Sequence, residues 1–144
     1  MLRIEQGVSS PDGTVIQAGY IVTGPNDARN WTLTGTVELS IKGNGSSWRY
    51  ETVQVGLLIP GIGDKLVRLQ QWAPFLTLQG LSNDKTAVNA GWLLDKMEIL
   101  DPQAACARIE FQCQIGVRDI DGYVLRLGYL IHAIGGLVPA PDIV

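Results

Sequence analysis

His132 is the only histidine in the chain, and it limits the chemistry that the sequence can support. A single imidazole excludes sites that need two, so a histidine-based zinc centre is not expected. The pattern Gly-x-Ser-x-Gly, which presents a nucleophilic serine on a sharp turn, does not occur. Glu110 is the carboxylate expected beside His132, because the predicted hairpin of residues 107–133 places the two residues opposite each other. A hydrolase would use these two residues as its acid–base pair; a cross-strand ion pair or a packed histidine is the alternative interpretation.

Two further groups could carry chemistry. Asp119 and Asp121 lie in one acidic turn, and clustered carboxylates suit Ca²⁺, but their spacing is that of ordinary turn aspartates and not of a calcium loop. Cys106 and Cys113 are seven residues apart on one predicted strand, which is too far for a disulfide at ~3.3 Å per residue. We therefore expect free thiols, and the sequence predicts neither a metal nor a cofactor.

The chain has four tryptophans, and aromatic rings of this kind stack well on sugars. The strand pattern sends Trp31 and Trp48 into the core. Trp72 and Trp92 are left as candidates for binding a carbohydrate or another small ligand, with burial in the core as the alternative.

These residues must be positioned by strands. Ala107 to Val117 and Tyr123 to Ala133 both alternate, with apolar side chains at odd numbers, as half-buried strands do. Ile120-Asp121-Gly122 between them predicts a tight three-residue loop. The resulting hairpin places Phe111 opposite Ile131 and Glu110 opposite His132.

A second hairpin is predicted around Asn44-Gly45, the strongest short turn signal available. Residues 31–42 alternate, and a two-residue loop would place Trp48 opposite Ile41 and Tyr50 opposite Leu39. The opposite face of this hairpin then carries aliphatic side chains beside threonines, at Thr34, Val53, Val55 and Leu57.

The rest of the chain is also broken into short strands. Residues 2–8 predict an edge strand that could form a hairpin with 14–23, and residues 65–72 a strand that ends at Ala73-Pro74. Residues 92–100 fit either a helix or a strand with one polar defect, and 86–90 tolerate one helical turn. Residues 1–144 therefore predict one all-β domain, an antiparallel β-sandwich with at most one short helix and a loose tail from about 135; a closed β-barrel is the alternative.

Composition bounds the partners. The net charge is −3 and the 11 Lys and Arg residues are scattered, so nucleic acid is not an expected partner. No run of 18 apolar residues and no charged-then-apolar leader pattern occurs, which predicts a cytoplasmic protein without a membrane partner.

Only 17% of the residues are charged, below the usual ~25%, so part of the surface is expected to be covered. We expect a non-enzymatic module that forms a homo-oligomer through Thr34, Val53, Val55, Leu57 and Leu130, and on this view Val55→Lys would give a folded monomer. The alternatives are a carbohydrate-binding module and, third, a hydrolase.

Overall fold

The computed structural model describes residues 1–25, 28–41, 48–59, 65–83, 91–100, 103–104, 108–118 and 123–139. Within the strands it leaves out the side chains of residues 65, 66, 81–83, 91, 92, 103, 104, 123 and 139. The regular elements are all strands: β1 (Leu2–Glu5), β2 (Gly13–Thr23), β3 (Arg29–Ile41), β4 (Trp48–Leu58), β5 (Lys65–Asn83), β6 (Gly91–Leu100), β7 (Gln103–Ala104), β8 (Arg108–Arg118) and β9 (Tyr123–Pro139). No helix that could cross a membrane is found among these residues. The helical turn predicted at 86–90 lies outside them.

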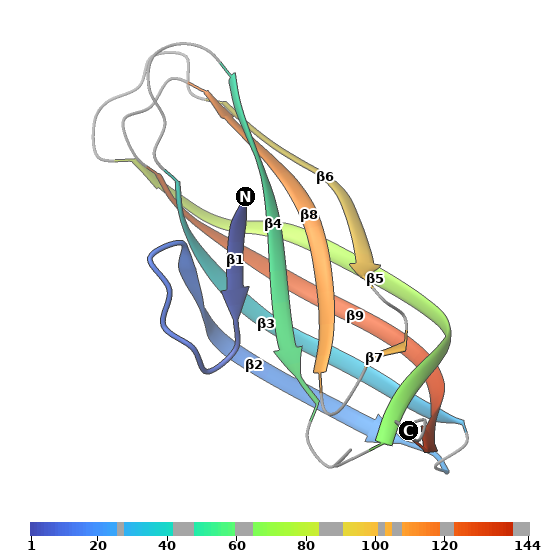
Figure 1. Ribbon diagram of the computed structural model, residues 1–144. Helices are drawn as coiled ribbons and strands as arrows, with labels where there is room; N and C mark the ends of the chain where they lie inside the picture. Colours follow the sequence, from blue (N-terminus) through green and yellow to red (C-terminus); the bar gives the residue numbers. More distant parts are fainter. Residues whose placement is uncertain are drawn as a thin grey trace, which may run out of the picture.

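The strands form a sandwich of two sheets, which confirms the predicted fold. One sheet has the order β1-β4-β8-β6, and the other has the order β2-β3-β9-β5-β7, where β7 is only two residues long. The two layers cross obliquely, with the four-stranded sheet in front in Figure 1. Because the sheets are separate, the alternative of a closed barrel is wrong.

The chain changes sheet at almost every step, and this overturns the predicted hairpins. β3 pairs with β2 and β9, whereas β4 pairs with β1 and β8. β8 and β9 likewise lie in different sheets, and so do β1 and β2. β1 is the expected edge strand, but it runs parallel to β4. The tight loops predicted at 44–45 and 120–122 lie outside the described residues.

The inward faces of most strands were nevertheless predicted correctly. Phe111, Ile115, Leu127 and Ile131 are all at most 2% exposed. Phe111 and Tyr129 do not lie on one hairpin; they meet across the core, with ring centroids 5.7 Å apart and planes inclined by 47°. An alternating strand of either sheet turns its apolar face to the same core, so the faces survive the change of partner.

Tyr129 lies close to Gly35, its direct partner in β3. A Cβ atom built on Gly35 would meet the hydroxyl of Tyr129, would lie 2.6 Å from its Cζ atom, and would also meet the backbone oxygen of Gln17. Only glycine leaves room for the ring and the neighbouring strand here.

Two strands are longer than the sequence suggested. β5 runs through Pro74, which lies opposite Ile131. Beyond the two residues that pair with β7, no described strand borders the other side of β5, so Pro74 lies on an edge strand, where proline is tolerated. β9 continues to Pro139, with Gly135 paired to both β3 and β5, and the tail is therefore not loose from about 135.

β6 is a strand with a bulge, which resolves the ambiguity of residues 92–100. Its register with β8 shifts between Asp95 and Glu98, and Lys96 within the shift has a φ of 54°. Leu94 before the bulge pairs with Ile115, and Ile99 after it pairs with Phe111. The extra residue moves the inward face from even to odd numbers, which no uninterrupted period of two could show.

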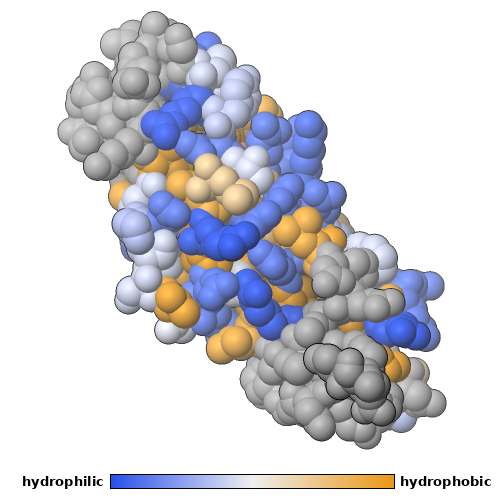
Figure 2. Space-filling model, in the orientation of Figure 1, coloured by the Kyte–Doolittle hydropathy of each residue, from blue (hydrophilic) through white to orange (hydrophobic). Residues whose placement is uncertain are grey.

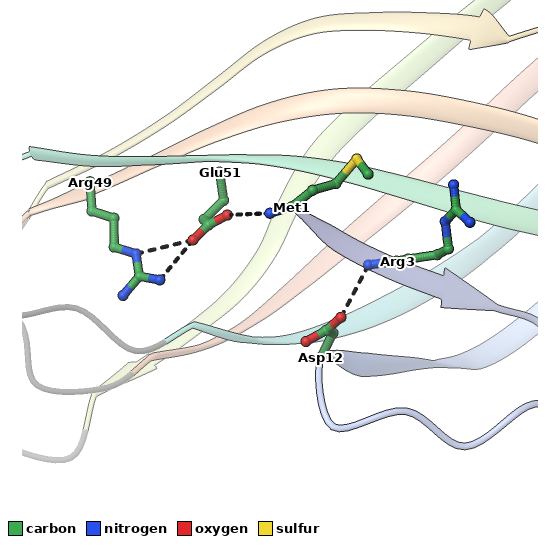
Figure 3. Close-up of polar contacts among 5 residues, drawn as sticks. All are labelled: Met1, Arg3, Asp12, Arg49 and Glu51. Atoms are coloured by element: carbon green, nitrogen blue, oxygen red, sulfur yellow. Dashed lines mark hydrogen bonds and ion pairs between the residues drawn. The ribbon is translucent and has the colours of Figure 1, made fainter.

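Polar contacts fasten β1 and the residues that follow it (Figure 3). Glu51 accepts hydrogen bonds from Arg49, at 2.8 Å from Nη2, and lies 3.3 Å from the amino group of Met1. Asp12 accepts a hydrogen bond from the backbone N–H of Arg3 at 3.2 Å. Burial acts to raise the pKa of Glu51, but the Arg49 and amino-group contacts outweigh it, and the net pKa is lowered.

Candidate functional site

A row of polar side chains that bond to one another crosses the outer face of the four-stranded sheet. Arg3, Gln54, Gln112 and Glu98 lie in one row across all four strands. Arg3 donates to Gln54 at 2.9 Å, Gln54 to Gln112 at 2.9 Å, and Gln112 to Glu98 at 3.3 Å. Hydrophilic side chains accordingly cross this face in Figure 2. Such a face suits contact with water.

Two arginines make further contacts on the same face. Arg108 donates to Glu5 at 2.7 Å, and its guanidinium lies where a side chain at Gly56 would be. Arg118 lies over the ring of Trp48, 5.1 Å from the ring centroid. Apolar side chains are exposed on this face too, namely Trp48, Tyr50, Leu58 and Leu93, but they share it with these ion pairs and bonded polar rows.

The outer face of the five-stranded sheet is different, because its middle carries no charged residue. Four consecutive rows each take one residue from β2, β3, β9 and β5. We call this surface the neutral face, and its rows are Thr23-Asn30-Ile134-Gln71, Ile21-Thr32-His132-Ala73, Gly19-Thr34-Leu130-Phe75 and Gln17-Thr36-Gly128-Thr77. Large apolar side chains stand in it exposed: Ile21 by 66%, Phe75 by 57% and Ile134 by 38%.

Charge returns only at the ends of the neutral face. Glu38 and Arg126 form an ion pair of 3.1 Å in the row beyond Thr36 and Gly128. At the other end Arg68 lies opposite Gly136.

A shallow pocket of about 290 Å³ opens in the neutral face where β3, β9 and β5 meet. Its lining includes Asn30, Gln71, Trp72, Ala73, His132 and Ile134. The hydroxyl of Thr32 lies 3.3 Å from Nδ1 of His132, within hydrogen-bond distance of the imidazole ring. Amides, an imidazole and a small apolar floor can hold a neutral group, and none of the described residues that line the pocket is an Asp, Glu, Lys or Arg.

The predicted pair of Glu110 and His132 does not exist. Glu110 is on the outer side of β8, where Nη2 of Arg108 lies 3.8 Å from it, and His132 is on the outer side of β9 in the other sheet. The core and two sheet layers about 10 Å apart separate them. A hydrolase built on this pair is therefore excluded.

The tryptophans were placed correctly in part. Trp31 is in the core at 1% exposed, but Trp48 is on the outer face of its sheet, 38% exposed and stacked on Tyr50. Trp72 is 42% exposed and lines the pocket, although its partner Ala133 places it at an inward-facing position. The side chain of Trp92 lies outside the described part of the chain.

The predicted interface residues divide between two places. Thr34 and Leu130 are direct neighbours on the neutral face, beside Phe75. Val53, Val55 and Leu57 are instead at most 1% exposed in the core, because the inward residues of β4 are the odd-numbered ones. These three cannot form an outer surface, and the prediction of an interface through them is wrong.

No group of three His, Cys, Asp or Glu side chains that could hold a metal ion occurs among the described residues. Asp119 and Asp121 lie outside those residues, as does Cys106. Cys113 has a free thiol, buried in the core, and burial raises its pKa to about 12.

Sequence reasoning missed Phe75 and Asn30, which lie in the rows next to His132 on the neighbouring strands, and Ile21, which lies in the row of His132 two strands away. The signal was present in the composition of β2, which has no charged residue over its whole length. Comparison with known proteins adds no analogy, because no family model, curated protein or solved structure matches the chain.

Proposed function

We propose that this protein is a non-enzymatic interaction module that self-associates through the neutral face. The observation that carries the proposal is the contrast between the two outer faces. One is crossed by mutually bonded polar and charged side chains, while four rows of the other hold no charge and expose Ile21, Phe75 and Ile134. Depletion of charge together with an exposed aromatic residue is typical of the centre of an interface.

The size of the neutral face is compatible with a stable contact. Strands about 4.8 Å apart and residues about 3.4 Å apart give four rows on four strands roughly 500 Å² in projection. Side-chain relief brings the accessible area closer to the ~800 Å² per partner of a standard interface. A second copy of the same chain could cover this face without any other kind of protein, and symmetric dimers are the commonest oligomers.

The oligomeric state tests this proposal. We expect the unmutated protein to sediment as an oligomer at tens of micromolar, and Phe75→Asp to sediment as a folded monomer. Tyr50→Asp is the matched control, because Tyr50 is 53% exposed on the outer face of the other sheet, and it should leave the oligomer intact. A monomeric unmutated protein, or an unchanged oligomer with Phe75→Asp, would contradict the proposal.

The pocket beside His132 supports a second candidate, the binding of a small neutral molecule such as a sugar. Asn30, Gln71 and His132 offer hydrogen bonds without charge. Titration calorimetry with neutral monosaccharides tests it: heat that disappears in Asn30→Leu would favour this function, and no heat with any of them would count against it.

A further inference from the structure

Large and small side chains alternate on the neutral face in a pattern that lets two copies of the face fit together. On β5, Ala73 and Phe75 are two residues apart, so a small and a large side chain stand in adjacent rows. On β2 the order is reversed, with Gly19 in the row of Phe75 and Ile21 in the row of Ala73. Each of the two rows therefore carries one projecting side chain and, at its other end, one small residue.

From this pattern we infer that two copies form a symmetric dimer in which Phe75 of each enters the pocket of the other over Ala73. The inference rests on the proposed self-association and specifies its geometry. The two-fold axis lies in the plane of the contact and crosses the strands between the Thr32 and Thr34 rows. Rotation about it places Phe75 over Ala73 of the second copy, and Ile21 over Gly19, at both ends of the rows.

This arrangement agrees with the known preferences of sheets. An axis that crosses the strands almost at right angles sets each strand nearly antiparallel to its copy, close to the aligned packing of stacked sheets. The pocket supplies the hollow that an aromatic anchor needs, at about 290 Å³ and directly at Ala73.

Three polar side chains of the neutral face, Thr32, His132 and Thr36, have partners before any contact forms. Thr32 and His132 lie within hydrogen-bond distance at 3.3 Å, and Thr36 donates to Gln79 at 2.8 Å. The Gln79 side chain occupies the space over Gly128, with its Cδ atom 2.9 Å from where a Cβ would lie. Covering groups that already have partners costs less than covering free ones, which favours association through this face.

Opposite charges at the two matched positions test the geometry. Ala73→Lys and Phe75→Asp should each weaken self-association on the order of a hundredfold, because a charge would be buried without a partner. Both positions are exposed, so circular dichroism should show folded chains. Mixing the two variants should restore a dimer, since the introduced lysine of one chain would face the introduced aspartate of the other while the second contact remains native.

Thr32→Lys is the matched control, because it puts a lysine in the same row as Ala73 but on β3. Mixed with Phe75→Asp, it should not restore the dimer. If both single variants are monomers and the mixture of Ala73→Lys with Phe75→Asp stays monomeric, the geometry is wrong although the neutral face is still the interface. If both single variants assemble like the unmutated protein, the proposed function fails as well.

Discussion

Replacing Gly35 with alanine tests how closely the larger sheet is packed. The added methyl group would meet the backbone oxygen of Gln17 and the hydroxyl of Tyr129, with Cζ of the same ring 2.6 Å away. Backbone cannot yield as a flexible side chain can, and Tyr129 is held in the core at 4% exposed beside Phe111. The substitution therefore forces either a strand or a buried ring to move.

Overpacking of this kind typically costs ~1–3 kcal/mol. For a chain of this size, 1 kcal/mol corresponds to roughly 2–4 °C in Tm, so Gly35→Ala should melt about 2–12 °C lower. Gly80→Ala is the control, because its methyl group would meet only Arg126 side-chain atoms at 3.7 and 3.9 Å. Removing a glycine from the unfolded chain stabilises by ~0.4–1 kcal/mol where the site accepts alanine, so Gly80→Ala should melt at the same temperature or higher.

Thermal unfolding followed by circular dichroism, at one protein concentration for all three proteins, measures the difference. The reasoning is refuted if Gly35→Ala is as stable as Gly80→Ala. An intermediate result is resolved by urea unfolding, where the midpoint of Gly35→Ala should fall while the slope m stays the same.

Three further predictions concern other parts of the molecule. Val55→Lys should unfold the protein and not release a folded monomer, since it buries an ammonium group at a core position that is 1% exposed; a cooperative melt near that of the unmutated protein would contradict this. The pKa of Glu51 is lower in the folded protein than in the unfolded chain, so its ion pair stabilises the fold, by ~0.5–1 kcal/mol for a partly exposed pair. This stabilisation is fully present above the pKa of Glu51 in the unfolded chain and is lost as the pH falls through its pKa in the folded protein. Glu51→Gln should therefore flatten the dependence of stability on pH in this acidic range, and an unchanged slope would argue against it. Cys113 should resist alkylation at neutral pH in the folded state, and peptide mass spectrometry that finds equal labelling with and without urea would show that the thiol is not buried.

Alternation along the chain predicted faces but could not predict partners. Phe111 and Ile131 were both assigned to the inner face correctly, because the period of two depends only on the local chain. The pairing of one with the other depended on the loop between them being a hairpin. Any strand with one apolar face shows the same alternation, so the pattern cannot distinguish a hairpin from a crossover to the other sheet.

The candidate site was predictable in its members but not in its arrangement. Trp72 and His132 were each predicted as candidate site residues because of their side-chain chemistry, and the structure places both at one pocket. They meet because β5 pairs with β9, which local sequence does not encode. The error at Val53 and Val55 has the same cause, since their face was assigned through the wrong partner strand.

The place of β9 has a consequence for how the chain folds. It lies between β3 and β5, yet it is the last of the described strands to be synthesised. Thr32 and His132, which face each other in the finished sheet, are 100 residues apart in the chain. Until β9 emerges from the ribosome, the pair of β2 and β3 and the pair of β5 and β7 have no strand to join them into one sheet. Closing such distant contacts is slow, and sandwiches of this kind typically fold in milliseconds to seconds. The interval leaves the hydrogen-bonding edge of β3 that β9 will cover open to neighbouring chains during synthesis, when a chaperone would have most to protect.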